Sequence, residues 1–257
     1  MITRRAFLGA GALAALAAIG AACTSDAGDA GDAQSATTLV PTTPPTQLPA
    51  PSAGAAKFVV SGPSTRSRVA LTFHTDGDLA LAQEYLDVLS ARDVAVTCFV
   101  VGKWLDVNPS WAHKLADAGH ELANHTYNHL TFGQLRSEQM TDEIARCRDL
   151  LVRLTGKPGK YFRPSGTDDG RSTPSDAVLD ASGAAGYATV LGFDVDPLDY
   201  NDPGAAAVTQ RALAGVHAGS IVSLHFGHAG TLAALPGILD GLARRNLSPV
   251  TTSELLA

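Results

Sequence analysis

The 257-residue sequence is short of several residue types, and each shortage excludes a class of protein. Aromatic residues make up 6% of the chain, too few for a broad aromatic platform that binds sugars by stacking. Lysine and arginine (19) do not outnumber aspartate and glutamate (25), and the formal charge of −6 leaves no basic field for nucleic acid. No long run of like charge and no internal repeat interrupts the pattern of an ordinary globular chain.

Cysteine is also scarce, with three residues in the whole chain. Cys23 belongs to the N-terminal segment, Cys98 lies in an apolar run and Cys147 lies in a helical pattern. An exported protein would permit a disulfide between the last two, but two cysteines are no disulfide framework. We therefore predict two isolated, buried thiols.

The first 23 residues have the pattern of an export signal. A basic start is followed by an Ala/Gly/Leu-rich run, and Thr3–Leu8 (TRRAFL) also fits a twin-arginine pattern. The stretch Gly20–Cys23 resembles the cleavage box of bacterial lipoproteins, although its first position is usually Leu. We expect export, with a lipidated Cys23 that anchors the protein to the outer face of the cell membrane. An uncleaved membrane anchor is the alternative, and it also places the rest of the chain outside the cytoplasm.

Residues 24–56 have few large apolar side chains and are rich in Ala, Gly, Asp, Thr, Pro and Ser. Such a segment cannot bury enough surface to offset its ordering entropy. We predict a flexible tether, stiffened in its second half by prolines. Residues 57–257 then form one folded domain.

Short β-type runs alternate with helical patterns throughout residues 57–257. This alternation predicts parallel strands with helical crossovers, and about seven such units favour a (β/α) barrel over an open sheet. The predicted strands are 68–73, 94–101, 121–124, 161–163, 187–191, 220–225 and 248–250. The predicted helices are 79–91, 109–118, 137–154, 174–182, 204–217 and 231–244.

Polar side chains recur where the predicted strands end. In a parallel α/β fold these ends share one face, where functional sites form. The residues concerned are Asp76, Asp78, His125, Arg163, Asp196, Asp199 and His225.

The stretch His125-Thr-Tyr-Asn-His129 is the most informative of these. Two histidines four residues apart on one helical turn share a face, so both imidazoles can reach one ion. Imidazole is a common ligand for zinc and neighbouring metals, and Asp76 or Asp78 would supply an anionic third ligand. Such a set leaves positions open for water. The alternatives are a capped helix start with two polar histidines, and aspartates that serve only a turn and a helix cap.

A second group lies nearer the C-terminus. His225 stands where an apolar run stops, and a buried strand rarely ends in a histidine without a polar partner, for which Asp199 is the candidate. A carboxylate beside an imidazole favours the protonated ring, which is then a competent general acid. Arg163, at the end of another predicted strand, can hold a carboxylate in a bidentate pair. The alternatives are a satisfied loop histidine and a structural ion pair.

Together these motifs resemble the polysaccharide deacetylases of carbohydrate esterase family 4, the NodB-homology domain. The resemblance covers about Arg68 to the C-terminus and rests mainly on Asn124–His129 (NHTYNH) and on 219–225 (GSIVSLH). It implies a distorted (β/α) barrel of about seven parallel strands. It also implies a divalent metal, usually zinc, held by an Asp-His-His set, and an acetylated polysaccharide as the substrate. His225 would be the general acid and Asp199 the residue that tunes it.

The first motif departs from the family pattern. The family usually has T-F-D-D-G, whose first Asp is the base and whose second Asp is a metal ligand. Here Phe73 is followed by His74-Thr-Asp-Gly-Asp78, so the register is ambiguous. We prefer Asp78 as the metal ligand and leave the base open between Asp76 and His74. If His74 is the base, either aspartate can bind the metal.

The sequence therefore predicts an exported, metal-dependent hydrolase that removes N- or O-linked acetyl groups from a cell-wall or extracellular polysaccharide. The third motif, usually R-x-P-x-G, reads Arg163-Pro-Ser-Gly and lacks the second proline. This departure bears on the identity of the substrate more than on metal binding. Two alternatives stay open: a surface carbohydrate-binding protein with a degenerate site, and a metal-dependent amidohydrolase acting on a small amide or peptide. We predict no nucleic-acid partner and membrane contact only through the N-terminal lipid anchor. The oligomeric state stays open.

Overall fold

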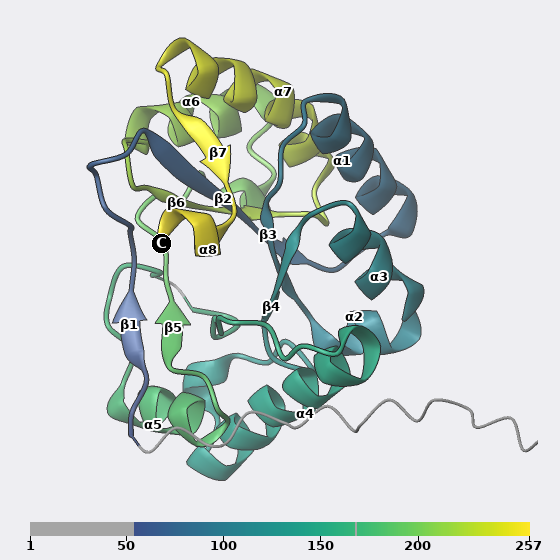
Figure 1. Ribbon diagram of the computed structural model, residues 1–257, viewed down its shortest axis with the longest axis vertical. Coiled ribbons are helices and arrows are strands. Elements are labelled where there is room, and N and C mark those ends of the chain that lie inside the picture. Colours follow the sequence, from purple (N-terminus) through teal and green to yellow (C-terminus); the bar gives the residue numbers. More distant parts are fainter. Residues whose placement is uncertain (1–53, 168) are drawn as a thin grey trace, which may run out of the picture. The chain divides into compact units, whose positions relative to one another are not determined.

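The computed structural model describes residues 54–167 and 169–257 (Figure 1). The predicted export signal and nearly all of the predicted tether lie outside these residues. No helix within the described ranges has both the length and the apolar character needed to cross a membrane. Cys98 and Cys147 are buried and unbonded, as predicted.

Parallel strands form the centre of the domain, and helices connect most successive strands. One sheet has the order β4-β3-β2-β6, with β7 also paired to β2, and β1 pairs separately with β5. All five strand pairings are parallel. The strands are β1 Lys57–Val59, β2 Arg68–Thr75, β3 Thr97–Val100, β4 Glu121–Asn124, β5 Thr189–Leu191, β6 Ile221–His225 and β7 Ser248–Val250.

Single parallel bridges complete the circuit between the two sheets. Asn124 bridges to Phe162, Phe162 to Val190, and Val195 to Val222, so the path leads from β4 through β5 back to β6. The predicted strand 161–163 is reduced to the bridge at Phe162. These seven short strands confirm the predicted α/β architecture, a distorted barrel of parallel strands.

Helices cover the outside of the strands. In Figure 1, α1, α6 and α7 lie at one end of the domain, and α4 and α5 at the other. The α-helices are α1 Leu79–Ala91, α2 Gly102–Val107, α3 Ser110–Asp117, α4 Ser137–Thr155, α5 Asp176–Ala184, α6 Ala205–Gly215, α7 Ala229–Arg244 and α8 Thr252–Leu255. Two 3₁₀ turns, η1 Phe132–Gln134 and η2 Asp199–Asn201, follow strand ends. The predicted helices are present within a few residues, whereas β1, α2 and α8 were not predicted because they are too short to show periodicity.

An aromatic cluster in the core supports the C-terminal ends of β2 and β6. Phe73 and Phe226 lie with ring centroids 5.0 Å apart, and Tyr85 from α1 stacks on Phe226 at 4.6 Å. The Tyr85 hydroxyl contacts the carbonyl oxygens of His225 at 3.0 Å and His228 at 2.8 Å. The core therefore fixes the backbone around the end of β6.

Candidate active site

Histidines and carboxylates from several strand ends meet at one cavity of about 460 Å³. The cavity lies at the C-terminal ends of β2 and β6, where the register of the sheet places His74 directly opposite His225. Parallel strands bring their C-terminal side chains together at this edge, as the sequence predicted. The titratable residues in its lining are His74, Asp76, His129, Asp196, His225 and His228.

The two histidines of the Asn124–His129 motif lie close together, but not on a helix. The chain leaves β4 in an irregular turn in which Thr126 (φ 68°) and His129 (φ 59°) both adopt the left-handed conformation. The helical spacing argument was therefore wrong. Its consequence still holds, because the rings of His125 and His129 have centroids only 4.9 Å apart.

His125 presents an unpartnered nitrogen inside the protein. Its Nδ1 lies 2.9 Å from the carbonyl oxygen of Arg163, so Nδ1 carries the proton and donates it. Its Nε2 is buried and has no hydrogen-bond partner. A metal-binding histidine has this arrangement, with one ring nitrogen held by a backbone carbonyl and the other free to coordinate.

Asp78 is held at the start of α1 and is not in the lining of the cavity. Its Oδ1 accepts hydrogen bonds from the backbone of Ala80 (2.9 Å) and Leu81 (3.0 Å), which makes it the N-cap of α1. The preference for Asp78 as a metal ligand is thus corrected in favour of the capping alternative. Asp76 lines the cavity instead.

A complete metal centre is not preformed in the described part of the chain. No group of three or more His, Cys, Asp or Glu side chains there is placed to hold an ion. The donor types nevertheless suit zinc: two imidazoles, one with a buried free lone pair, and a carboxylate in the same cavity.

A chain of hydrogen bonds links His74, one of the two candidate bases, to His225, the predicted acid. Arg163 Nη1 donates to His74 Nε2 at 3.2 Å, since a guanidinium cannot accept. The remaining proton of a neutral His74 ring is then on Nδ1, which lies 2.7 Å from His225 Nε2. His225 in turn donates from Nδ1 to Asp199 Oδ1 at 2.8 Å. Each ring therefore has one defined tautomer.

Asp199 is the buried end of this chain, as the sequence predicted, with 1% of its surface exposed. Its Oδ2 accepts from the backbone N–H of His225 at 2.8 Å and from the Thr231 hydroxyl at 2.7 Å. Sequence reasoning missed Thr231 and Tyr85, because neither belongs to a local motif. The position of Thr231 shortly after His225, at the start of a helix, was the available signal.

Arg163 has a different partner from the one we expected. Its guanidinium is buried and donates to the carbonyl oxygens of Leu191 (3.1 Å) and Gly192 (3.0 Å), and to Thr72 Oγ1 (3.0 Å). No described carboxylate forms a salt bridge with it. Burial lowers the pKa of Arg163 to about 9. The expected carboxylate pair is thus replaced by a contact with His74.

Comparison with known proteins shows the family to which the chain belongs. The model of the polysaccharide deacetylase family matches residues 61–190. The chain belongs to the polysaccharide deacetylase family. A peptidoglycan-N-acetylglucosamine deacetylase of Bacillus cereus is 31% identical over 198 residues, which are 76% of this chain and 90% of that protein. The resemblance predicted from the motifs is confirmed.

Two solved structures of family 4 carbohydrate esterases show the same fold. One, from Streptomyces lividans and in complex with acetate, is 32% identical, with a TM-score of 0.64 over 71% of this chain and 91% of the other. The second is a mutant, with restored enzymatic activity, of a pseudoenzyme from Bacillus anthracis. It is 25% identical, with a TM-score of 0.71 over 79% of this chain and 72% of the other.

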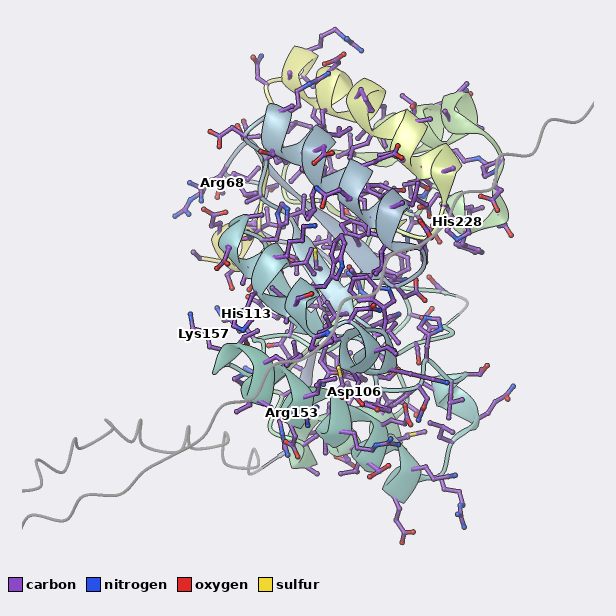
Figure 2. All side chains as sticks on the ribbon, turned by 90° about the vertical axis from the view of Figure 1, so that its right-hand side faces the viewer. Arg68, Asp106, His113, Arg153, Lys157 and His228 are labelled. Carbon is purple, nitrogen blue, oxygen red and sulfur yellow. The ribbon has the colours of Figure 1, made fainter. Side chains whose placement is uncertain are left out.

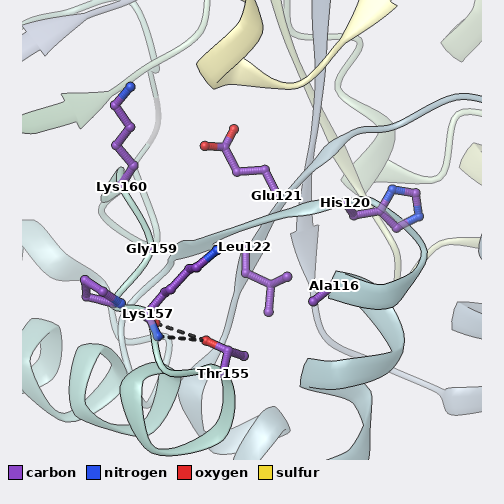
Figure 3. A pocket seen from close by; sticks show the side chains of 9 residues that line it. Ala116, His120, Glu121, Leu122, Thr155, Lys157, Gly159 and Lys160 are labelled. Atoms are coloured by element: carbon purple, nitrogen blue, oxygen red, sulfur yellow. Dashed lines mark hydrogen bonds between the residues drawn. The ribbon is translucent and has the colours of Figure 1, made fainter. Parts of the chain in front are cut away.

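This polysaccharide deacetylase family member has a second cavity, of about 520 Å³. It lies where β4 begins, at the N-terminal end of that strand. Its lining includes Glu121, Lys157 and Lys160 (Figure 3). The Glu121 carboxylate accepts hydrogen bonds from Thr97 and Ser253, which is a structural role. In Figure 2, His228, at the rim of the histidine cavity, lies on the other side of the domain from Lys157. The histidine cavity is therefore the candidate active site.

Burial lowers the pKa of three histidines near the site, His74, His125 and His129. It lowers the pKa of His74 and of His125 well below 6.5, and each ring is further disfavoured as a cation by neighbouring imidazoles. Burial also lowers the pKa of His129, partly offset by Asp76. The same cause raises the pKa of Asp196.

Acidification is expected to destabilise the metal-free protein between pH 7.5 and 5.5. The unfolded chain takes up protons on these histidines as the pH falls below 6.5, whereas the folded chain does not, so the unfolded state is favoured. Each buried histidine contributes up to about 1.4 kcal/mol per pH unit below that value. Urea unfolding in the presence of a chelator, repeated at several pH values, measures this decrease in the free energy of unfolding.

In the same titration, the free energy of unfolding of His74→Gln should fall less steeply with pH than that of the parent, because this variant lacks one of the buried histidines. His113→Gln, at an exposed position on α3, is the control for removal of a histidine. A stability that is constant or rises on acidification across this window would contradict the expectation.

Proposed function

We propose that this protein is a metal-dependent hydrolase that removes acetyl groups from a polysaccharide of the cell wall. The observation that carries the proposal is the Asp199–His225 pair at 2.8 Å, at the edge of a cavity that also contains His129 and Asp76. The family supports the reaction type, and the deacetylase of Bacillus cereus supports an N-acetylglucosamine polymer as the substrate class.

His125, His129 and Asp76 are the residues that we propose as metal ligands, with zinc as the ion. Nε2 of His125 has no other partner, His129 is adjacent, and Asp76 supplies the anionic oxygen from the cavity lining. A bound ion of this kind polarises a carbonyl and makes a water molecule easier to deprotonate.

His225 and His74 would together move the proton. In the resting arrangement the two rings share one N–H between His74 Nδ1 and His225 Nε2, and Asp199 faces the far side of His225. When a water oxygen attacks the acetyl carbonyl, the Nε2 of His225 would release its hydrogen bond from His74 and accept the proton that the water loses, and Asp199 would stabilise the resulting cation. The same proton then passes to the leaving nitrogen or oxygen as its bond to the carbonyl carbon breaks.

Arg163 would orient His74 rather than contact the substrate. Its four hydrogen bonds hold the guanidinium in place, and its position against the ring of Phe99, 4.1 Å away, removes it from water. The contact with His74 Nε2 sets the tautomer of His74 and so directs the N–H toward His225.

We further propose that the protein is exported and held at the outer face of the cell membrane through Cys23. The N-terminal pattern supports this, as does a relative that acts on peptidoglycan, a polymer outside the cytoplasm. Labelling of Cys23 with a fatty-acid analogue in cells, lost in Cys23→Ser, tests the anchor. An unlabelled parent protein would contradict it.

The activity is tested by measuring acetate released from peptidoglycan, chitin oligomers and acetylated xylan. We expect release from at least one of these, loss of release on chelation, and recovery with Zn²⁺ or Co²⁺. A metal-loaded protein that releases no acetate from any of the three would refute the proposal.

A second candidate function is glycan binding without turnover. Two observations favour it: His74, one of the two candidate bases, is hydrogen-bonded to His225, and a solved relative is a mutant of a pseudoenzyme. Glycan binding that survives His225→Ala, with no acetate released by the parent, would support this alternative.

A further inference from the structure

The turn that carries His125 and His129 needs an external support. Thr126 is β-branched and adopts φ 68°, and His129 adopts φ 59°, so two non-glycine residues within four positions are left-handed. Such conformations persist only where the surrounding structure holds them. The groups that support this turn come from α2 and α4.

Backbone oxygens of the turn are held from one side by the start of α2. The backbone N–H of Gly102 donates to the Thr126 oxygen at 2.9 Å, and that of Lys103 to the Tyr127 oxygen at 2.8 Å. These contacts fix the carbonyl groups. They leave the N–H groups of the two middle residues, Tyr127 and Asn128, pointing the other way.

Glu143 of α4 receives those N–H groups. Its side chain is nearly buried, with 6% exposed, and Oε2 accepts from the backbone N–H of Tyr127 (3.2 Å) and of Asn128 (2.7 Å). Oε1 accepts from the side-chain amide of Asn128 at 2.5 Å. A buried carboxylate is stable only when its oxygens are satisfied, and the turn supplies these three donors.

The cation beside Glu143, Arg146, makes only a long contact with its carboxylate. Arg146, one turn further along α4, has Nη1 4.0 Å from Oε1, and its guanidinium stacks over the Tyr127 ring at 3.9 Å. Because Arg146 is itself about half exposed, the turn's N–H groups are the main partners of the carboxylate. Glu143 and the turn thus stabilise each other.

We propose that Glu143 is a positioning residue whose carboxylate fixes the Tyr127–Asn128 segment, so that His125 and His129 direct their rings to one point. The proposal rests on the proposed function, in which these two histidines hold the ion. Glu143 itself lies outside the histidine cavity and touches no reacting group. Without it, the turn loses the acceptor for three N–H bonds and relaxes toward ordinary backbone angles, which separates the two rings.

The test compares Glu143→Ala with Glu138→Ala in the full chain, each titrated with Co²⁺ alone while the visible absorption of the bound ion is recorded. Glu138 is exposed in the first turn of the same helix, so it controls for removal of a carboxylate from α4. We expect Glu143→Ala to bind Co²⁺ about 10–100-fold more weakly, with a changed spectrum, and Glu138→Ala to match the parent. A folded Glu143→Ala with parental affinity and spectrum would overturn the proposal.

If Glu143→Ala does not fold, an exchange of charge between the two partners replaces it. Asn128→Asp alone places two carboxylates against each other and should weaken Co²⁺ binding. Adding Glu143→Gln restores a donor–acceptor pair with the parental net charge and should recover at least tenfold of the lost affinity. A double variant that binds no better than Asn128→Asp would overturn the proposal.

Co²⁺ binding is measured without substrate, so the two proposals fail separately. A parent that binds Co²⁺ through the histidines but releases no acetate refutes the hydrolase and leaves the role of Glu143 intact. A parent that does not bind Co²⁺ at all refutes the role of Glu143.

Discussion

Replacing His125 by alanine is expected to reduce acetate release by more than about 100-fold, beyond the range typical of second-shell partners of a metal ligand. The Nε2 of His125 is buried without a hydrogen bond, so its lone pair is free to coordinate an ion in the proposed site. Removal of the ring also deletes the stacked neighbour of His74, whose centroid lies 4.1 Å away. Initial rates with the best acetylated substrate, together with the zinc content of the purified protein, measure the effect.

His113→Ala, at an exposed position on α3, is the control and should keep the parental rate and zinc content. The two measurements must change together. A His125→Ala protein that retains zinc and turns over within a few-fold of the parent would show that the ion is bound elsewhere.

Replacing Asp199 by asparagine is expected to lower kcat by about 10²–10⁴-fold, the usual value of positioned acid–base help. All hydrogen bonds from Arg163 through His74 and His225 to Asp199 point in one direction. An amide N–H at position 199 would face His225 Nδ1–H and turn the ring to its other tautomer. Nε2–H of His225 would then face Nδ1–H of His74, so the chain breaks at a second place.

Asp202→Asn is a matched control, because Asp202 also pairs with a histidine, His228, at 2.8 Å, but at the rim of the cavity. We expect a change of less than about threefold in kcat for this variant, in line with the small worth of exposed ion pairs. KM should be nearly unchanged in Asp199→Asn, since the interaction acts on the chemical step. A large rise in KM with an unchanged kcat would assign Asp199 to substrate binding instead.

The identity of the residues at the site could be predicted from the sequence more fully than their conformations and contacts could. The strand ends could be predicted from apolar runs, so the sequence placed His225 and Asp199 at one edge of the barrel, where the structure has them hydrogen-bonded to each other. The shape of the turn after Asn124 could not be predicted, since the backbone of Tyr127 and Asn128 between its two left-handed residues is hydrogen-bonded to Glu143 and α2, which are distant in the chain. Asp76 and Asp78 were equivalent by pattern, and only the start of α1 decides that Asp78 caps a helix.

Arg163 shows the same limit from another direction. Its strand-end position was predicted, but its hydrogen bonds go to backbone oxygens of Leu191 and Gly192, and no side-chain pattern reports a carbonyl. One side-chain partner of Arg163 is the imidazole of His74, where we expected a carboxylate. Partner choice of this kind depends on tertiary contacts rather than on local sequence.

The pairing of β1 with β5 sets a limit on how far the chain can be shortened. Lys57–Val59 lies before residue 61, where the match to the family begins, yet it supplies the parallel neighbour of Thr189–Leu191. A chain trimmed to the family boundary would leave β5 with an open edge of unpaired backbone groups, beside the buried side chains of Val190 and Leu191. The first strand of the described domain is therefore also part of the barrel wall. A force applied to the chain just before β1 would act directly on the pairing of β1 with β5.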